Sequence, residues 1–169
     1  MMETIQKNSF KEQSFKIREK KSDFDEMENF LYEAIFVPEF IPQPPREIIY
    51  QPRLQVYIKN FGQGTADFCF VAEVENKTVG ACWSRIMNDY GHIDDQTPSI
   101  ALSVLKNFRR RGIATALMKN LIDKLTAENF EKISLSVQKN NIIAVKLYQK
   151  LDFEIFHENE LEYIMTLQL

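Results

Sequence analysis

The chain has 169 residues, of which 44% are hydrophobic and 27% charged, and its formal net charge is −3. This balance is typical of one globular domain with a sizeable core, and it disfavours a general nucleic-acid or membrane-surface partner. No apolar run reaches about 18 residues, so no membrane-spanning helix is expected. The polar N-terminus lacks the apolar segment of a secretory signal, and the two cysteines form no C-x-x-C pair. We therefore expect a cytoplasmic protein, and the two distant histidines predict no zinc site.

The domain is predicted to begin after a loose arm. Residues 1–13 show no clear period, and one domain is expected over residues 14–169, with no linker or repeat inside it. Phe15 and Ile17 alternate with charged residues, which predicts a first strand over residues 14–19.

A helical region follows this strand. Asp23 and Glu26 have the spacing of a capping box, and the helix that they predict ends before Pro38. The proline-rich residues 38–52 are expected to form either a cap over the core or the wall of a substrate pocket. Residues 53–61 are expected to form a second, short helix.

The pattern then changes from a helical period to an alternating one. Residues 67–74 and 78–87 are expected to form an antiparallel hairpin with its turn near Asn76, followed by a polar loop over residues 88–98. Residues 99–105 are an apolar run, which predicts a buried strand.

The last third of the chain alternates between helix and strand. A helix is expected over residues 113–125, a strand over 131–138 and a second helix over 141–151. Two closing strands are expected over residues 153–156 and 163–167. The whole order of elements fits an α/β fold in which helices cover both faces of a mixed sheet.

Three arginines stand at the start of the helix predicted over residues 113–125. Arg109, Arg110 and Arg111 add positive charge where the helix dipole is already positive, at a cost of roughly 0.3–1 kcal/mol each. A bound anion would reverse this cost, because a helix N-terminus next to a glycine such as Gly112 is a favourable phosphate site. The turn therefore predicts a ligand that carries phosphate.

Two motifs resemble those of a known family. Arg109-Arg-Arg-Gly112-Ile-Ala114 fits the Arg/Gln-x-x-Gly-x-Gly/Ala signature of the GNAT superfamily of acyl-CoA-dependent N-acetyltransferases, and it stands between a strand and a helix as in that family. Asn141-Ile-Ile-Ala-Val-Lys-Leu-Tyr148-Gln-Lys-Leu-Asp-Phe153 resembles the family's Asn-x-x-Ala-x-x-Leu-Tyr-x-x-x-Gly-Phe helix. The resemblance implies the GNAT fold, with about seven strands in the order β-α-α-β-β-β-α-β-α-β-β.

The resemblance also implies acetyl-CoA as the cofactor, with no metal. In the family, backbone amides of the signature hold the pyrophosphate, and the pantetheine arm runs along the preceding strand. Asn141 is then a CoA contact, although it is also an ordinary N-cap. The residues expected to contact the cofactor are Leu102, Val104, Arg109, Arg110, Arg111, Gly112, Ile113, Ala114, Thr115, Asn141 and Tyr148.

Tyr148 matches the family tyrosine that protonates the leaving thiolate. A tyrosine with a pKa near 10 stays protonated at neutral pH and can donate to a thiolate, whose conjugate acid has a pKa of about 8.5. The alternative role is that of a core aromatic. The attacking amine also needs a base, but Ser99 stands where many relatives carry Glu. The candidate bases are Asp94 and Asp95, followed by His92, Glu73 and water.

The acceptor side is less defined by the sequence. Phe36, Trp83 and Tyr90 are candidate contacts to the acceptor, with a core role as the alternative for each. The function expected is transfer of an acetyl group to a primary amine of a small molecule or a peptide, by direct attack on the thioester. The alternative is a catalytically silent acyl-CoA-binding module, and the resemblance also allows a homodimer.

Overall fold

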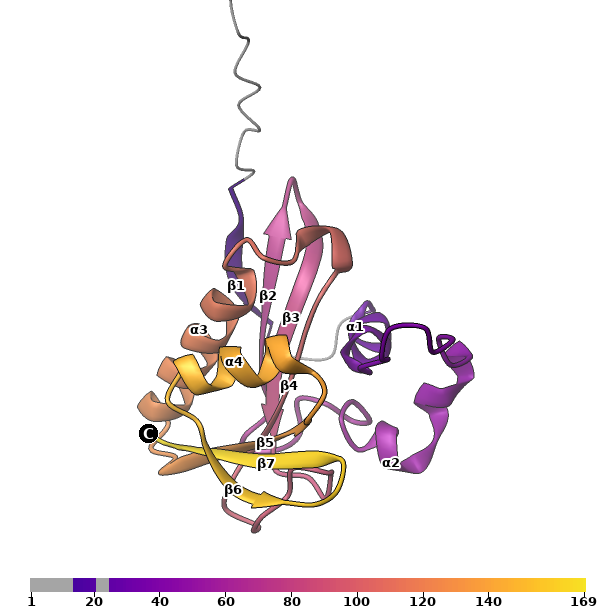
Figure 1. Cartoon of the computed structure of the whole chain (residues 1–169). Helices are drawn as coiled ribbons and strands as arrows, with labels where there is room; N and C mark the ends of the chain where they lie inside the picture. Colours follow the sequence, from indigo (N-terminus) through magenta and orange to yellow (C-terminus); the bar gives the residue numbers. More distant parts are fainter. Residues whose placement is uncertain (1–13, 21–24) are drawn as a thin grey trace, which may run out of the picture.

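The computed structural model describes residues 14–20 and 25–169 (Figure 1). One seven-stranded sheet has the order β1-β2-β3-β4-β5-β7-β6, and its neighbours are antiparallel except for the parallel pair β4–β5. The strands are β1 (Lys16–Lys20), β2 (Phe68–Val74), β3 (Lys77–Arg85), β4 (Ser99–Val104), β5 (Lys132–Gln138), β6 (Glu154–Glu158) and β7 (Glu162–Gln168). The helices are α1 (Met27–Ala34), α2 (Pro52–Gln55), α3 (Ile113–Ala127) and α4 (Ile142–Lys150), with 3₁₀ turns η1 (Arg46–Tyr50) and η2 (Lys106–Phe108).

The predicted fold class and element order are confirmed, with local differences. The regular helix expected over residues 53–61 is limited to the single turn of α2, and hydrogen-bonded turns follow it as far as Asn60, which adopts a left-handed φ of 55°. Its expected apolar residues Tyr57, Ile58 and Phe61 are nevertheless buried. The predicted arm over residues 1–13 and the predicted N-cap Asp23 lie outside the described residues.

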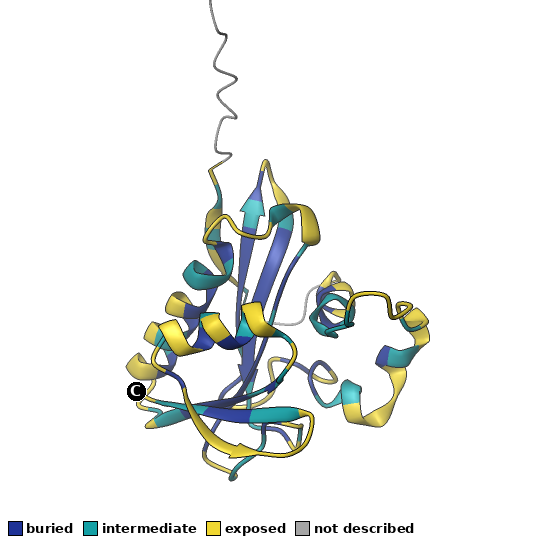
Figure 2. Cartoon of the chain, viewed as in Figure 1, coloured by how far each residue is buried: buried dark blue, intermediate teal, exposed yellow. Residues whose placement is uncertain are grey.

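Helices cover the sheet on both faces and bury two apolar clusters (Figures 1 and 2). On one face α3 packs against β2, β3 and β4, and the cluster beneath it includes Ile100, Leu117 and Leu121. On the other face α1 packs against β4, and its cluster includes Phe30 and Trp83. The central strands are apolar on both sides because both of their faces are covered.

The sheet opens between its two parallel strands. β3 and β4 pair from Gly80↔Val104 to Arg85↔Ser99, but β4 and β5 pair only at Ser99↔Ser134 among the described residues. Beyond this pair, towards their C-terminal ends, the two strands diverge. Edge groups of β4 that would otherwise bond to β5 are left without a strand neighbour, which creates a splay in the middle of the sheet.

A buried ion pair fixes the segment after α2 to the sheet. The guanidinium of Arg85 donates to both carboxylate oxygens of Asp67, at 3.2 and 3.1 Å, and to the carbonyl oxygens of Val56 and Lys59. The side chain of Asp67 is 2% exposed and also accepts the N–H of Gly62 at 2.9 Å. Removal of Arg85 would therefore leave a buried carboxylate without its cation.

We predict that Arg85→Met lowers the free energy of unfolding by about 3 kcal/mol, because removal of one partner of a buried ion pair leaves the other charge buried and uncompensated. Urea unfolding measures the change. The matched control is Arg18→Met, since Arg18 is 55% exposed in its pair with Glu73 and its loss should cost less than about 1 kcal/mol. Equal losses for the two variants would contradict the anchoring role of Arg85.

Candidate functional site

The turn from β4 to α3 forms a backbone surface open to an anion. Gly112 is the N-cap of α3 with a φ of 78°, a left-handed conformation that favours glycine. A Cβ added at Gly112 would meet no atom within 4 Å, so the space above this residue is open. Among the described residues, no acceptor takes the N–H groups of Gly112, Ile113, Ala114 or Thr115. Unpaired amides at the positive end of a fifteen-residue helix are suited to a phosphate group.

The three arginines surround this turn in different ways. Arg109 Nε donates to the carbonyl oxygen of Val104 at 2.8 Å, which ties the turn to the end of β4. Arg111 donates to the carbonyl oxygen of Asn107 at 3.0 Å, and its guanidinium carbon lies 5.2 Å from the ring centre of Phe108. Arg110 is exposed and has a left-handed φ of 59°. Two of the three arginines therefore support the turn itself, while all three keep the local field positive.

The predicted strand contacts lie beside the splay. Leu102 is half-buried and Val104 is buried, and both belong to the cluster beneath α3. Asn141 is the N-cap of α4, where its Oδ1 accepts the N–H of Ala144 at 3.3 Å. The predicted capping role of Asn141 is confirmed, and its contact with CoA stays a prediction.

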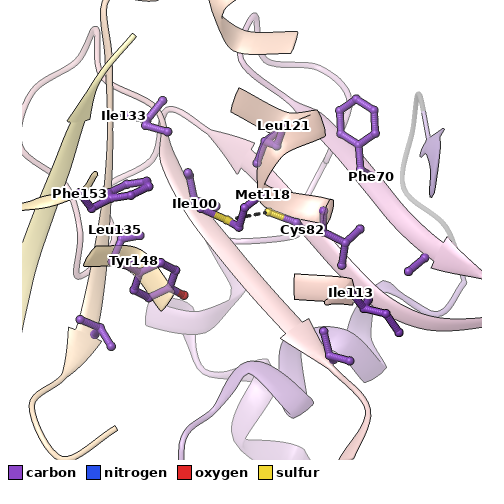
Figure 3. Close-up of a cluster of buried hydrophobic side chains, with 14 of the residues drawn as sticks. Phe70, Cys82, Ile100, Ile113, Met118, Leu121, Ile133, Leu135, Tyr148 and Phe153 are labelled. Carbon is purple, nitrogen blue, oxygen red and sulfur yellow. Dashed lines mark hydrogen bonds between the residues drawn. The ribbon is translucent and has the colours of Figure 1, made fainter. Parts of the chain in front are cut away.

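Tyr148 projects from α4 into the apolar cluster beneath α3 (Figure 3). It is 9% exposed and packs against Phe153 with ring centres 5.8 Å apart, and Figure 3 shows its hydroxyl on the side away from Phe153. No partner in the described part of the chain bonds this hydroxyl. Burial, with a smaller contribution from Cys82, raises the pKa of Tyr148 well above its ordinary value. The hydroxyl therefore stays protonated near neutral pH and has a proton to donate.

The two predicted bases lie on the closed side of the Ser99–Ser134 pair. Asp94 forms an ion pair of 2.8 Å with Lys132 at the start of β5, and this bond holds the pKa of Asp94 well below its usual range. Asp95 is 96% exposed and lies 3.6 Å from Nε2 of His92. The base role of Asp94 and Asp95 stays a prediction, but the structure does not bring either of them to the splay.

The three candidate acceptor contacts differ in how far they are buried. Trp83 is completely buried and donates its indole N–H to the carbonyl oxygen of Tyr57 at 3.0 Å, which is the core role given as its alternative. Tyr90 is 44% exposed, in the loop before β4. Phe36 is half-buried after α1. Of these, Tyr90 and Phe36 have side-chain surface that a ligand can reach.

Sequence reasoning missed a carboxylate next to Ser99. Asp89 Oδ1 accepts the hydroxyl of Ser99 at 2.8 Å, and the hydroxyl of Tyr57 also bonds to the carboxylate. Desolvation raises the pKa of Asp89 above its ordinary value, although the bonds from Ser99 and Tyr57 oppose this shift. No periodic signal marks Asp89, because it belongs to a polar loop that the fold brings onto β4.

Two negative findings apply to the described residues. None of their helices is long and apolar enough to cross a membrane. No three His, Cys, Asp or Glu side chains among them are grouped so as to hold a metal ion.

Comparisons with known proteins identify the family. A model of the acetyltransferase (GNAT) family matches residues 29–153. An N-alpha-acetyltransferase of Saccharolobus solfataricus is 37% identical over 93 residues, which are 50% of this chain and 55% of that relative. The match therefore spans about half the length of each protein.

Solved structures share the fold. A GNAT-family acetyltransferase from Streptococcus pneumoniae superposes with a TM-score of 0.66 at 18% identity, over 92% of this chain and 100% of that one. A GNAT-family acetyltransferase from Elizabethkingia anophelis with acetyl-CoA bound gives a TM-score of 0.62 at 19% identity, over 92% and 98% of the two chains.

Proposed function

The chain belongs to the acetyltransferase (GNAT) family, and on this basis we propose that it transfers the acetyl group of acetyl-CoA to a primary amine. The observation that carries the proposal is the splay between β4 and β5, which leads directly to the open amides at the start of α3. The free edge of β4 could bond to a long arm that contains amide groups, and the open amides that follow it could bind a pyrophosphate on the same ligand. The bound acetyl-CoA of the Elizabethkingia structure supports this ligand.

In this proposal each part of the site has one task. The amides of Gly112 to Thr115 bind the pyrophosphate, and the positive field of Arg109–Arg111 favours its approach. The pantetheine arm follows the free edge of β4 near Leu102 and Val104, where it bonds as an added strand would. Tyr148 then lies beside the splay as a donor for the sulfur that leaves.

The amine attacks the thioester directly, without an acyl-enzyme. Burial raises the pKa of the Cys69 thiol to about 12, and burial also raises the pKa of Cys82 well above its ordinary value. Both thiols are therefore protonated and buried, and neither is suited to act as a nucleophile.

Free-thiol release from acetyl-CoA with a panel of amines tests the function. The name of the archaeal relative puts peptides with a free α-amino group first in the panel, followed by small primary amines. We expect thiol release that depends on the amine, and an acetylated amine in the mass spectrum. Acetyl-CoA binding with no turnover on any amine would instead support the silent binding module.

We predict that Gly112→Glu weakens CoA binding at least tenfold, because a side chain and a negative charge would enter the open space above the amides. Calorimetry with CoA measures the affinity. Asn129→Glu is the matched control, since Asn129 is also exposed with a left-handed φ of 65° but lies at the other end of α3. Unchanged CoA affinity in Gly112→Glu would exclude the turn as the phosphate site.

We predict that Tyr148→Phe lowers kcat about 100-fold while the dissociation constant of acetyl-CoA changes little, because only the proton donor is lost. Steady-state kinetics and calorimetry separate the two effects. Tyr163→Phe on β7 serves as the control tyrosine and should keep kcat. If Tyr148→Phe keeps the wild-type kcat, Tyr148 is a core aromatic and not the acid.

A further inference from the structure

A carboxylate stands at the point where β4 and β5 begin to diverge. We propose that Asp89 is the general base that accepts the proton of the attacking amine, directly or through one water, with Ser99 and Tyr57 as its positioning residues. This inference rests on the acetyl transfer proposed above. It assigns the base to a residue outside the motifs that the sequence offers, on the loop that precedes β4.

Hydrogen bonds tie the loop of Asp89 to both strands of the splay. Oδ1 of Asp89 accepts the hydroxyl of Ser99 in β4 at 2.8 Å. Ser134, which is the residue of β5 paired with Ser99, donates its hydroxyl to the carbonyl oxygen of Gly91 at 2.7 Å. The loop is therefore bonded to β4 at Asp89 and to β5 at Gly91.

The loop is held in this position by close packing. A Cβ added at Gly91 would lie 2.9 Å from the carbonyl carbon of Leu135, so the loop backbone sits directly on β5. Nδ1 of His92 bonds with the carbonyl oxygen of Met87 at 2.9 Å, which closes the loop on itself. A base held by a packed loop has little freedom to lose when the substrate binds.

Asp89 and Tyr148 lie on opposite faces of the sheet. Along β4, Ser103 bonds to the carbonyl oxygen of Phe30 in α1, so Ser99 and Ser103 lie on the α1 face, two strand repeats apart. Tyr148 lies in the cluster on the α3 face. A thioester in the splay therefore has a proton acceptor on one face and a proton donor on the other, which suits an amine that enters from the α1 face and a thiol that leaves on the α3 face.

The surroundings of Asp89 favour basicity. Desolvation is the largest influence on its pKa and raises it, while hydrogen bonds from Ser99, Tyr57 and the Gly91 N–H lower it in part. Tyr57 is the titratable side chain bonded to it, and burial and the charge of Asp89 raise the pKa of Tyr57, so that this neighbour stays neutral. No Lys or Arg of the described chain forms an ion pair with Asp89. The carboxylate is therefore a better proton acceptor than Asp94, which Lys132 holds in its ionised form.

The proposed step is balanced in protons and bonds. An amine that enters as an ammonium ion first gives one proton to Asp89, which passes it to solvent, so that the nitrogen has a free lone pair. Asp89 then accepts a proton from the nitrogen as the N–C bond forms at the thioester carbon. The C–S bond then breaks, and the sulfur takes a proton from Tyr148. Asp89 afterwards releases its proton to solvent and Tyr148 regains one, so that the products are the amide and free CoA, with one additional proton if the amine enters as an ammonium ion.

The main test is Asp89→Asn, which keeps the shape of the side chain and removes its basicity. We expect kcat/KM for the amine to fall about 10²–10⁴-fold, while acetyl-CoA affinity and the circular dichroism spectrum stay unchanged. The difference in kcat/KM between variant and wild type should become smaller as the pH rises, because the amine then loses its proton in solution. Asp123→Asn, on the exposed side of α3, is the matched control and should keep the wild-type rate. Parallel variants Asp94→Asn and Asp95→Asn test the other carboxylates.

The outcomes separate this inference from the proposed function. Asp89 is not the base if Asp89→Asn has the kcat/KM of an active wild type, or if kcat/KM falls only in Asp94→Asn or Asp95→Asn. In both cases the proposed transferase function stands. A wild type that binds acetyl-CoA but acetylates no amine overturns both.

A second variant keeps the carboxylate and changes only its surroundings. Ser99→Ala removes a bond that lowers the pKa of Asp89, so the pKa should rise and the acidic limb of the kcat/KM profile should move to higher pH. Above this limb Asp89 is ionised, so the loss of rate relative to the wild type should be smaller than at acidic pH. A lower rate with the limb in its wild-type place would mean that Ser99 acts without Asp89 and would overturn the assignment.

Discussion

The single Ser99↔Ser134 pair between β4 and β5 is the constraint on which the rest of the site depends. Backbone groups in the middle of a sheet are normally paired by the neighbouring strand, and a buried group without a partner is costly. Here the sheet is held together on both sides of the gap by long antiparallel ladders, so it tolerates an open edge at its centre. This open edge gives an extended ligand a place to bond that no closed sheet provides.

The turn after β4 places positive charge next to the positive end of the α3 dipole, which is unfavourable unless that charge is stabilised. Arg109 and Arg111 donate to carbonyl oxygens within the turn, so part of their charge is used to stabilise its shape. Gly112 leaves the space above the amides open. The turn therefore combines a preformed backbone with a field that remains favourable to an anion, which is the arrangement expected of a site whose ligand brings the compensating charge.

The fold class and the element order could be predicted from the sequence, because they depend on local period, and a short motif marked the turn before α3 as a candidate phosphate site. Sequence reasoning failed where tertiary packing decides the outcome. The period of residues 141–151 predicts a helix but does not settle all of its buried face: Ile143 is 65% exposed, whereas Val145 and Tyr148 are buried. The sequence did not indicate Asp89 as a site residue, because its partners Ser99 and Tyr57 lie 10 and 32 positions away. Only the folded chain brings the three residues together.

Amide hydrogen exchange with and without saturating acetyl-CoA tests the proposed binding mode, because it reports on the backbone groups that the ligand is proposed to bond. We predict slower exchange for the amides of Gly112 to Thr115 and for the edge of β4, while the amides of β1 and β6 keep their rates. Saturation with acetyl-CoA that leaves the amides of Gly112 to Thr115 unprotected, or that protects another region instead, would contradict it.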